Sequence, residues 1–145
     1  EKRKLMKKPL LWEINRGLSL NNEDIVQASK IRSEWFEKMA FLLNKYDAAV
    51  LPSAQVQPFD IDKEYPETIS NFSLDTYHRW MQVVVPASLI GLPAISLPAG
   101  FCENNLPFGI QLIGKQFSDN HLLQIAECWH KATSFPEKYP PSLIN

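Results

Sequence analysis

Glycine is scarce in this sequence: the 145 residues contain five glycines, against eleven prolines. A phosphate-binding loop needs clustered glycines, because the backbone must approach the phosphates closely, so the composition argues against such a loop. Cysteine is scarcer, and the two present, Cys102 and Cys128, have no metal-type spacing. Two cysteines cannot build a disulfide-rich secreted scaffold, so we expect reduced thiols in a cytoplasmic protein.

An excess of either charge is also missing. The chain has 15 basic and 16 acidic residues, a formal net charge of −1, which argues against a nucleic-acid-binding surface over the whole molecule. Residues 1–8 (EKRKLMKK) are the exception, with five basic side chains. A tether to nucleic acid or membrane and a solvated helical turn both fit this segment, and we favour the turn. The apolar stretch that follows is too short for a signal peptide.

One long stretch, residues 80–102, lacks charged residues and is long enough to span a bilayer. Pro86, Pro93 and Pro98 interrupt it, and each would break a helical hydrogen bond inside lipid. The stretch therefore predicts a helix end, a tight turn and a strand buried on both faces of an α/β sheet. We expect neither a membrane nor a nucleic acid as partner.

The length suits a single domain, and its first half predicts helices followed by a strand. Residues 4–16 predict a short helix that ends before Gly17. Asn21 or Asn22 can cap a second helix of about six turns that ends near Asn44. Its apolar stripe recurs at helical spacing: Ile25, Ala28, Ile31, Trp35, Met39 and Leu42.

The rest of the chain predicts an alternation of strands and helices. Residues 46–51 are typical of a short strand, and residues 53–74 of a long loop. Asp75 is expected to cap a helix that Pro86 kinks or ends. Two strands follow, with Asn104-Asn105 as the turn of a hairpin, and then a helix and an irregular tail; their ranges are 94–101, 107–113, 119–132 and 136–145.

Complete catalytic motifs are absent. No serine lies in a Gly-x-Ser-x-Gly elbow; we interpret Ser96 as a core hydroxyl, and Ser53 as either a turn residue or a ligand contact. His78 can face a pocket or solvent, and the histidine spacings predict no metal site. Cys128 and all four tryptophans are expected in the core, on the apolar stripes of helices.

Three segments together resemble the amidase signature family. They are YDAAVLPS at 46–53, GLPAISLPAGF at 91–101 and LPFGIQLIG at 106–114. Their order and spacing agree with that family over residues 12–132. The resemblance implies an α/β fold: the C-terminal part of the amidase-signature mixed β-sheet, covered by helices.

The resemblance also implies a hydrolase that cleaves carboxamide C–N bonds through a Ser–cis-Ser–Lys triad, without a cofactor. The family's triad segments lie N-terminal to the matched part, and nothing here resembles them. We therefore interpret residues 1–145 as the C-terminal segment of an amidase domain, which supplies sheet scaffold and a pocket wall but no catalytic residue. The isolated segment is expected to be inactive and to self-associate through residues 80–113.

The pocket residues that this resemblance implies bind a small amide substrate. Ser53 and Gln55 would stand at the mouth, and Tyr77, Trp80 and Met81 near the acyl group. Met81 takes the place at which glutamine-using relatives carry an acid, and a thioether cannot pair with an ammonium. This favours a general amidase with an apolar acyl group. The alternative is a truncated, non-catalytic protein that acts as a binding or interaction module.

Overall fold

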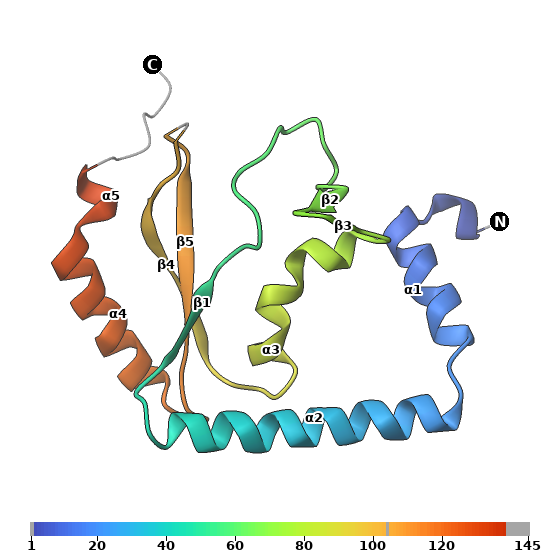
Figure 1. Ribbon diagram of the computed structural model, residues 1–145, viewed down its shortest axis with the longest axis horizontal. Helices are drawn as coiled ribbons and strands as arrows, with labels where there is room; N and C mark the ends of the chain where they lie inside the picture. The colour runs from blue at the N-terminus through green and yellow to red at the C-terminus, as the bar shows by residue number, and fades with distance from the viewer. Residues whose placement is uncertain (1, 104, 139–145) are drawn as a thin grey trace.

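The structure, a computed structural model, describes residues 2–103 and 105–138 (Figure 1). Helices dominate the chain, and the strands are short. The helical elements are η1 (Lys2–Leu5), α1 (Lys8–Leu18), α2 (Asn22–Leu43), η2 (Tyr77–Val84), α3 (Val85–Ser88), α4 (Asp119–Thr133) and α5 (Phe135–Lys138). The strands are β1 (Ala49–Pro52), β2 (Thr68–Ile69), β3 (Phe72–Ser73), β4 (Ala94–Phe101) and β5 (Pro107–Ile113).

The main sheet has three strands in the order β1-β5-β4, and both pairings are antiparallel. The predicted hairpin of β4 and β5 is confirmed. Asn105 has a φ of 59°, a conformation that asparagine tolerates better than most residues. A register shift between Pro98 and Gly100 bends β4. The α/β class predicted from the sequence is therefore confirmed.

Successive residues of β5 point to opposite faces of the sheet, and each face has its own core. Ile113 packs with Met39 and Leu43 from the end of α2 and with Ala87 and Ile90 around α3. On the other face, Leu112 packs under α4 with Leu97, Leu122 and Ala126. The alternation of side chains along a strand thus gives the central strand of this small sheet a helix on each side.

The N-terminal helices extend away from the sheet (Figure 1). Asn21 caps α2 as predicted: its side chain accepts from the Asp24 backbone, and the Asp24 carboxylate accepts from the Asn21 backbone. The predicted apolar stripe is not buried in this part, where Ile25 and Ile31 are 59% and 52% exposed. We call α1 together with residues 22–34 the helical arm.

The segment before β4 differs from the predicted helix. Thr76, not Asp75, is the N-cap of η2, and the Asp75 carboxylate instead accepts a hydrogen bond from the Arg79 side chain at 2.9 Å. Pro86 lies in the first turn of α3, where its missing N–H has no helical acceptor to lose. The expected break at this proline is therefore a change from 3₁₀ to α geometry.

Other expectations need smaller corrections. Gly17 lies inside α1, the predicted long loop carries the β2–β3 hairpin, and α5 occupies the start of the predicted irregular tail. Residues 139–145 of that tail lie outside the described residues. Cys128 and Trp12 are exposed rather than buried in the core.

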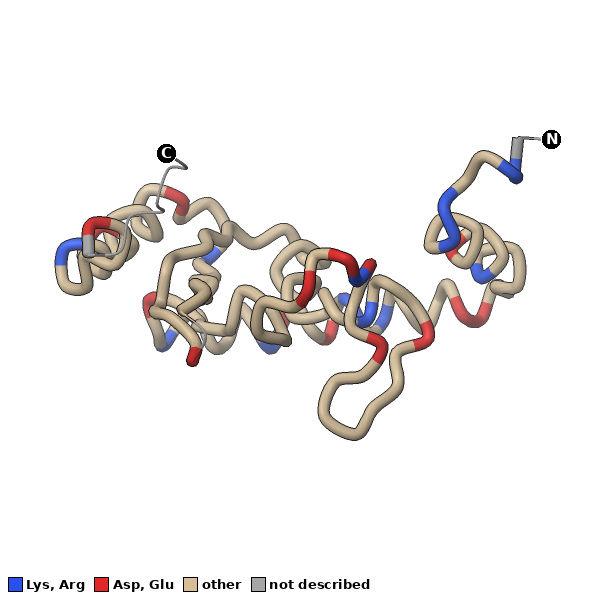
Figure 2. Tube along the Cα trace, turned by 90° about the horizontal axis from the view of Figure 1, so that it is seen from above, with Lys and Arg blue, Asp and Glu red and all other residues tan. Residues whose placement is uncertain are grey.

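The uncharged stretch 80–102 forms η2, α3 and β4, and β4 is only partly buried. None of the helices within the described ranges combines the length and the hydropathy that crossing a membrane requires. Basic residues gather near the N-terminus, in the segment that leads into α1 (Figure 2).

Candidate functional site

A cavity of about 710 Å³ lies where the ends of β1, β4 and β5 meet the start of the long loop. We call it the strand-side cavity. Its lining is mainly apolar: prolines, aromatic rings and aliphatic side chains surround a few polar groups. The lining residues are Pro52, Ser53, Ala54, Gln55, Val56, Gln57, Pro58, Phe59, Trp80, Ser96, Leu97, Pro98, Pro107, Phe108 and Gly109.

Close packing of main chain forms one side of this cavity. The Ser53 N–H donates to the Gly109 carbonyl at 3.0 Å, which extends the pairing of β1 and β5 by one residue. A Cβ atom on Gly109 would lie 2.7 Å from the Ser53 hydroxyl and 2.9 Å from the Leu97 carbonyl oxygen. Glycine is therefore required here by space, and the strands can approach only because the side chain is missing.

The side chains of two glutamines connect η2 to the strands β1 and β5 by hydrogen bonds. Gln111 is buried, and its side-chain N–H₂ donates to the carbonyls of Pro52 and Val83, both at 2.9 Å. The Gln55 side-chain carbonyl accepts from the Val83 N–H at 2.9 Å. These bonds connect β1, β5 and η2, and η2 carries Trp80. Sequence reasoning missed Gln111, although a lone amide inside an apolar strand was a usable signal.

Four aromatic side chains form a continuous row beside the cavity. Phe59 meets Trp80 edge to face at 5.5 Å, Trp80 meets Tyr77 at 5.9 Å, and Tyr77 meets Tyr65 at 5.9 Å. We call Phe59, Trp80, Tyr77 and Tyr65 the aromatic row. Aromatic pairs prefer this edge-to-face arrangement, so the four rings form one continuous surface.

The five predicted pocket residues do not all gather at one cavity. Ser53, Gln55 and Trp80 line the strand-side cavity together. Tyr77 contacts Trp80 but lines a second cavity, and the half-buried Met81 lines neither of the two. Ser96, interpreted as a core hydroxyl, is exposed at the strand-side cavity. The binding roles of all five residues remain predictions.

The second cavity, of about 830 Å³, lies between α1, residues 59–68 and the start of η2. Phe59 lines both cavities. Four acidic side chains line it, so we call it the acidic cavity; they are Asp62, Glu64, Glu67 and Asp75. The hydrogen bond from Arg79 holds the pKa of the Asp75 carboxyl below its ordinary value, so this acid is ionised and paired.

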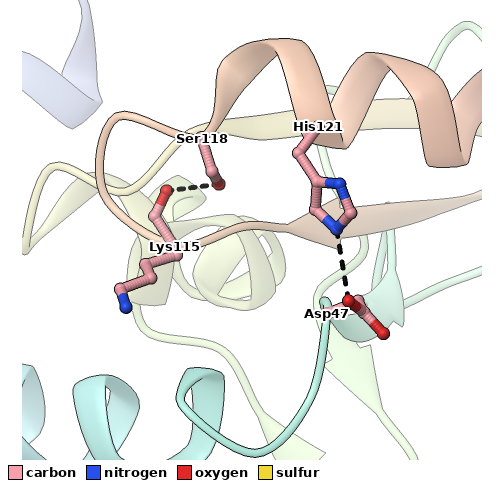
Figure 3. Close-up of polar contacts among 4 residues, drawn as sticks. All are labelled: Asp47, Lys115, Ser118 and His121. Carbon is pink, nitrogen blue, oxygen red and sulfur yellow. Dashed lines mark hydrogen bonds and ion pairs between the residues drawn. The ribbon is translucent and has the colours of Figure 1, made fainter.

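A third group of polar side chains resembles a catalytic triad in composition only (Figure 3). His121 Nε2 lies 3.2 Å from Asp47 Oδ1, and these side chains are 51% and 83% exposed. Ser118 Oγ does not reach the imidazole: it donates to the Lys115 carbonyl at 2.6 Å. Nucleophile and base are thus unconnected, and the group fastens the start of α4 to the segment before β1.

The described residues form two cavities with different linings. Within residues 2–103 and 105–138, no three His, Cys, Asp or Glu side chains are placed to hold a metal ion. The strand-side cavity can take an apolar or flat aromatic group, with hydroxyl and amide side chains at its edge.

Comparison of the sequence with family profiles identifies the family of this chain. The profile of the Amidase family matches residues 2–123, and the chain belongs to that family. It is 36% identical over 114 residues to the glutamyl-tRNA(Gln) amidotransferase A-type subunit of Dehalococcoides mccartyi, covering 74% of this chain and 22% of that protein. The same subunit from Thermotoga maritima is 35% identical over 111 residues, covering 77% and 22%.

Solved structures give the same fold. A bacterial aryl acylamidase of the amidase signature family superposes with a TM-score of 0.82 at 21% identity, over 96% of this chain and 29% of that one. The T. maritima amidotransferase subunit gives a TM-score of 0.58 at 30% identity, over 90% and 26%. The present chain thus spans about a quarter of the length of these relatives.

Proposed function

We propose that this chain is the C-terminal segment of an amidase that hydrolyses carboxamide C–N bonds. In this reaction water adds its oxygen to the acyl carbon, the C–N bond breaks, and the nitrogen leaves as a protonated amine. The segment supplies the sheet scaffold and one wall of the substrate cavity. The catalytic groups come from other polypeptide; in the group that resembles a triad, Ser118 donates to the Lys115 carbonyl and His121 contacts Asp47, so its nucleophile and base are not connected.

The observation that carries this proposal is the strand-side cavity within a chain that matches the Amidase family. All three family-like segments meet there: Ser53 follows β1, Leu97 belongs to β4, and Gly109 belongs to β5. Hydrogen bonds of Gln55 and Gln111 hold η2 in place, and η2 positions Trp80 at the strand-side cavity.

The lining favours an amide with an apolar or aromatic group. Phe59, Trp80 and Phe108 offer ring surfaces, and four prolines add apolar walls without hydrogen-bond donors. A charged acyl group would lose its hydration here without a partner of opposite charge, which costs a few kcal/mol. We therefore infer selectivity for aromatic or aliphatic amides, and a cytoplasmic location in keeping with the low cysteine content.

The test compares two proteins. The purified 145-residue chain should hydrolyse neither acetanilide nor benzamide above background, whereas the natural polypeptide that contains this segment should hydrolyse at least one. In the active protein, Trp80→Ala or Phe108→Ala should lower kcat/KM for aromatic amides about tenfold, because each change removes a ring from the cavity. Phe72→Ala, an exposed ring outside the cavity, is the matched control.

The alternative function, a non-catalytic binding module, is favoured by the exposed apolar residues of the helical arm. The same experiment separates the two. Hydrolysis by the isolated chain would contradict the segment proposal, and inactivity of the complete natural polypeptide would favour the binding module.

A further inference from the structure

The acidic cavity carries a chemistry that differs from that of the strand-side cavity. Its volume of about 830 Å³ lies in the range that small organic ligands occupy. Its walls come from three separate places: Lys8, Pro9 and Trp12 of α1, the segment from Phe59 to Thr68, and Asp75 to Tyr77. Figure 1 shows α1 beside the β2–β3 hairpin, so segments far apart in the sequence come together at this cavity.

Unpaired negative charge lines this cavity. Arg79 neutralises Asp75, but within the described part of the chain no cationic side chain lies within 4.0 Å of the carboxylates of Asp62, Glu64 or Glu67. Lys8 and Lys63 line the cavity too, yet they form no ion pair with these acids. A cationic group on a ligand would supply the partner that the carboxylates lack.

Aromatic rings stand beside this charge. Trp12, Phe59, Tyr65 and Tyr77 line the cavity, and the contact of Tyr65 with Tyr77 at 5.9 Å and 86° fixes two of these rings. The face of an aromatic ring attracts ammonium groups and also packs against apolar carbon. Rings and carboxylates together therefore suit an amine that carries an apolar or aromatic body.

Thr76 provides independent evidence for a polar ligand atom. It lines the cavity, is 4% exposed, and its hydroxyl has no hydrogen-bond partner among the described residues. A threonine at the N-cap of a helix normally accepts a hydrogen bond from the first turn, but this hydroxyl makes no such bond. Buried polar groups without partners are uncommon, and a bound amine can satisfy this one by donating to it.

We propose that the acidic cavity binds a protonated primary amine with an aromatic or apolar body. The amine is the leaving group of amide hydrolysis, an assignment of role that rests on the function proposed above. The aromatic row separates the two cavities, with Phe59 common to both. An amide that spans the row would place its apolar part on the strand side and its amine part on the acidic side.

The direct test is calorimetric titration of the 145-residue chain with 2-phenylethylamine. The neutral 2-phenylethanol and the anionic 3-phenylpropanoate serve as probes of similar shape. We expect saturable binding of the amine at least tenfold tighter than that of either analogue. Equal binding of all three, preference for the anion, or no binding of the amine would overturn the proposal.

Variants locate the binding. The double change Glu64→Gln and Glu67→Gln should weaken amine binding about tenfold or more and leave 2-phenylethanol unaffected, because it removes only charge. Glu37→Gln, an exposed acid on α2, is the matched control and should change nothing. An unchanged amine affinity in the double variant would place the binding elsewhere and contradict the proposal.

The variant Thr76→Val distinguishes a role of Thr76 in amine binding from a purely structural role. Its hydroxyl has no partner, so replacing it by a methyl group should leave the thermal midpoint unchanged or higher. Amine binding should nevertheless weaken several-fold. A lower midpoint with unchanged affinity would contradict the role of Thr76. Amine binding needs no catalysis, so it can succeed where the amidase assay fails, and the two proposals can be refuted separately.

Discussion

The two ends of this molecule bury their apolar residues to very different degrees. At the sheet, β5 lies between two cores, and Ile113 is 1% exposed. On the helical arm, Ile25 and Ile31 repeat at equally regular spacing, yet each residue is more than half exposed. Both regions have well-formed secondary structure. The difference shows that an apolar stripe specifies a helix face, while a tertiary partner decides whether that face is buried.

Truncating one isoleucine in each region should give the largest difference between them, measured as the loss in the free energy of unfolding. Ile113→Ala should lower the free energy of unfolding by about 2–5 kcal/mol, because it leaves a cavity between β5 and α2. Ile25→Ala, the matched change on the arm, should alter it by less than about 0.5 kcal/mol. Urea denaturation at low protein concentration measures both. A comparable loss at Ile25 would show that the arm is buried in solution.

The second expectation concerns association of the 145-residue chain, which should form dimers or larger assemblies at micromolar concentration. The arm exposes apolar side chains, and β1 and β4 are unpaired edges of the sheet. Light scattering should give masses above 16.6 kDa.

Two variants then identify the surface that associates. Ile25→Glu combined with Ile31→Glu should restore the monomer if the arm drives assembly, and Val50→Glu on β1 should do so if the sheet edge drives it. The sequence-based expectation placed the interface in residues 80–113, so dissociation by the arm variant alone would correct it. A monomeric parent chain would contradict association altogether.

The smallest effect is expected at the Asp75–Arg79 pair, between the two regions. In the folded protein, Arg79 lowers the pKa of the Asp75 carboxyl below its value in the unfolded chain, which is about 4. The pair therefore stabilises the fold at pH values above about 4. This contribution is lost as the pH falls through the lower folded value. Asp75→Asn should remove that part of the pH dependence, measured by thermal unfolding from about pH 6 to pH 2. Both side chains are exposed, so high salt should abolish the difference.

Local signals in the sequence predicted local structure well. Alternating residues and Asn105 predicted the β4–β5 hairpin, and Asn21 with its acidic first turn predicted the cap of α2. Such local signals could not predict the cavities, because each cavity is formed by segments far apart in the chain. The Gln55–Val83 bond, for example, connects residues 28 positions apart.

The geometry of η2 explains why the predicted pocket residues separate. In an α-helix, Tyr77, Trp80 and Met81 would share one face, since they stand three and four positions apart. With three residues per turn, only Tyr77 and Trp80 align. Their rings are in contact, while Met81 lines neither cavity.

The close approach at Gly109 limits how this protein can acquire new selectivity. Main-chain atoms and one hydroxyl occupy the space where a side chain would stand, so that side of the strand-side cavity cannot be reshaped by substitution at this position. Mutational variation is confined to the rim, where Val56, Phe59, Trp80 and Phe108 line the cavity from loop, helix and strand. New substrate preferences can therefore arise at the rim without disturbing the strand pairing on which the fold depends.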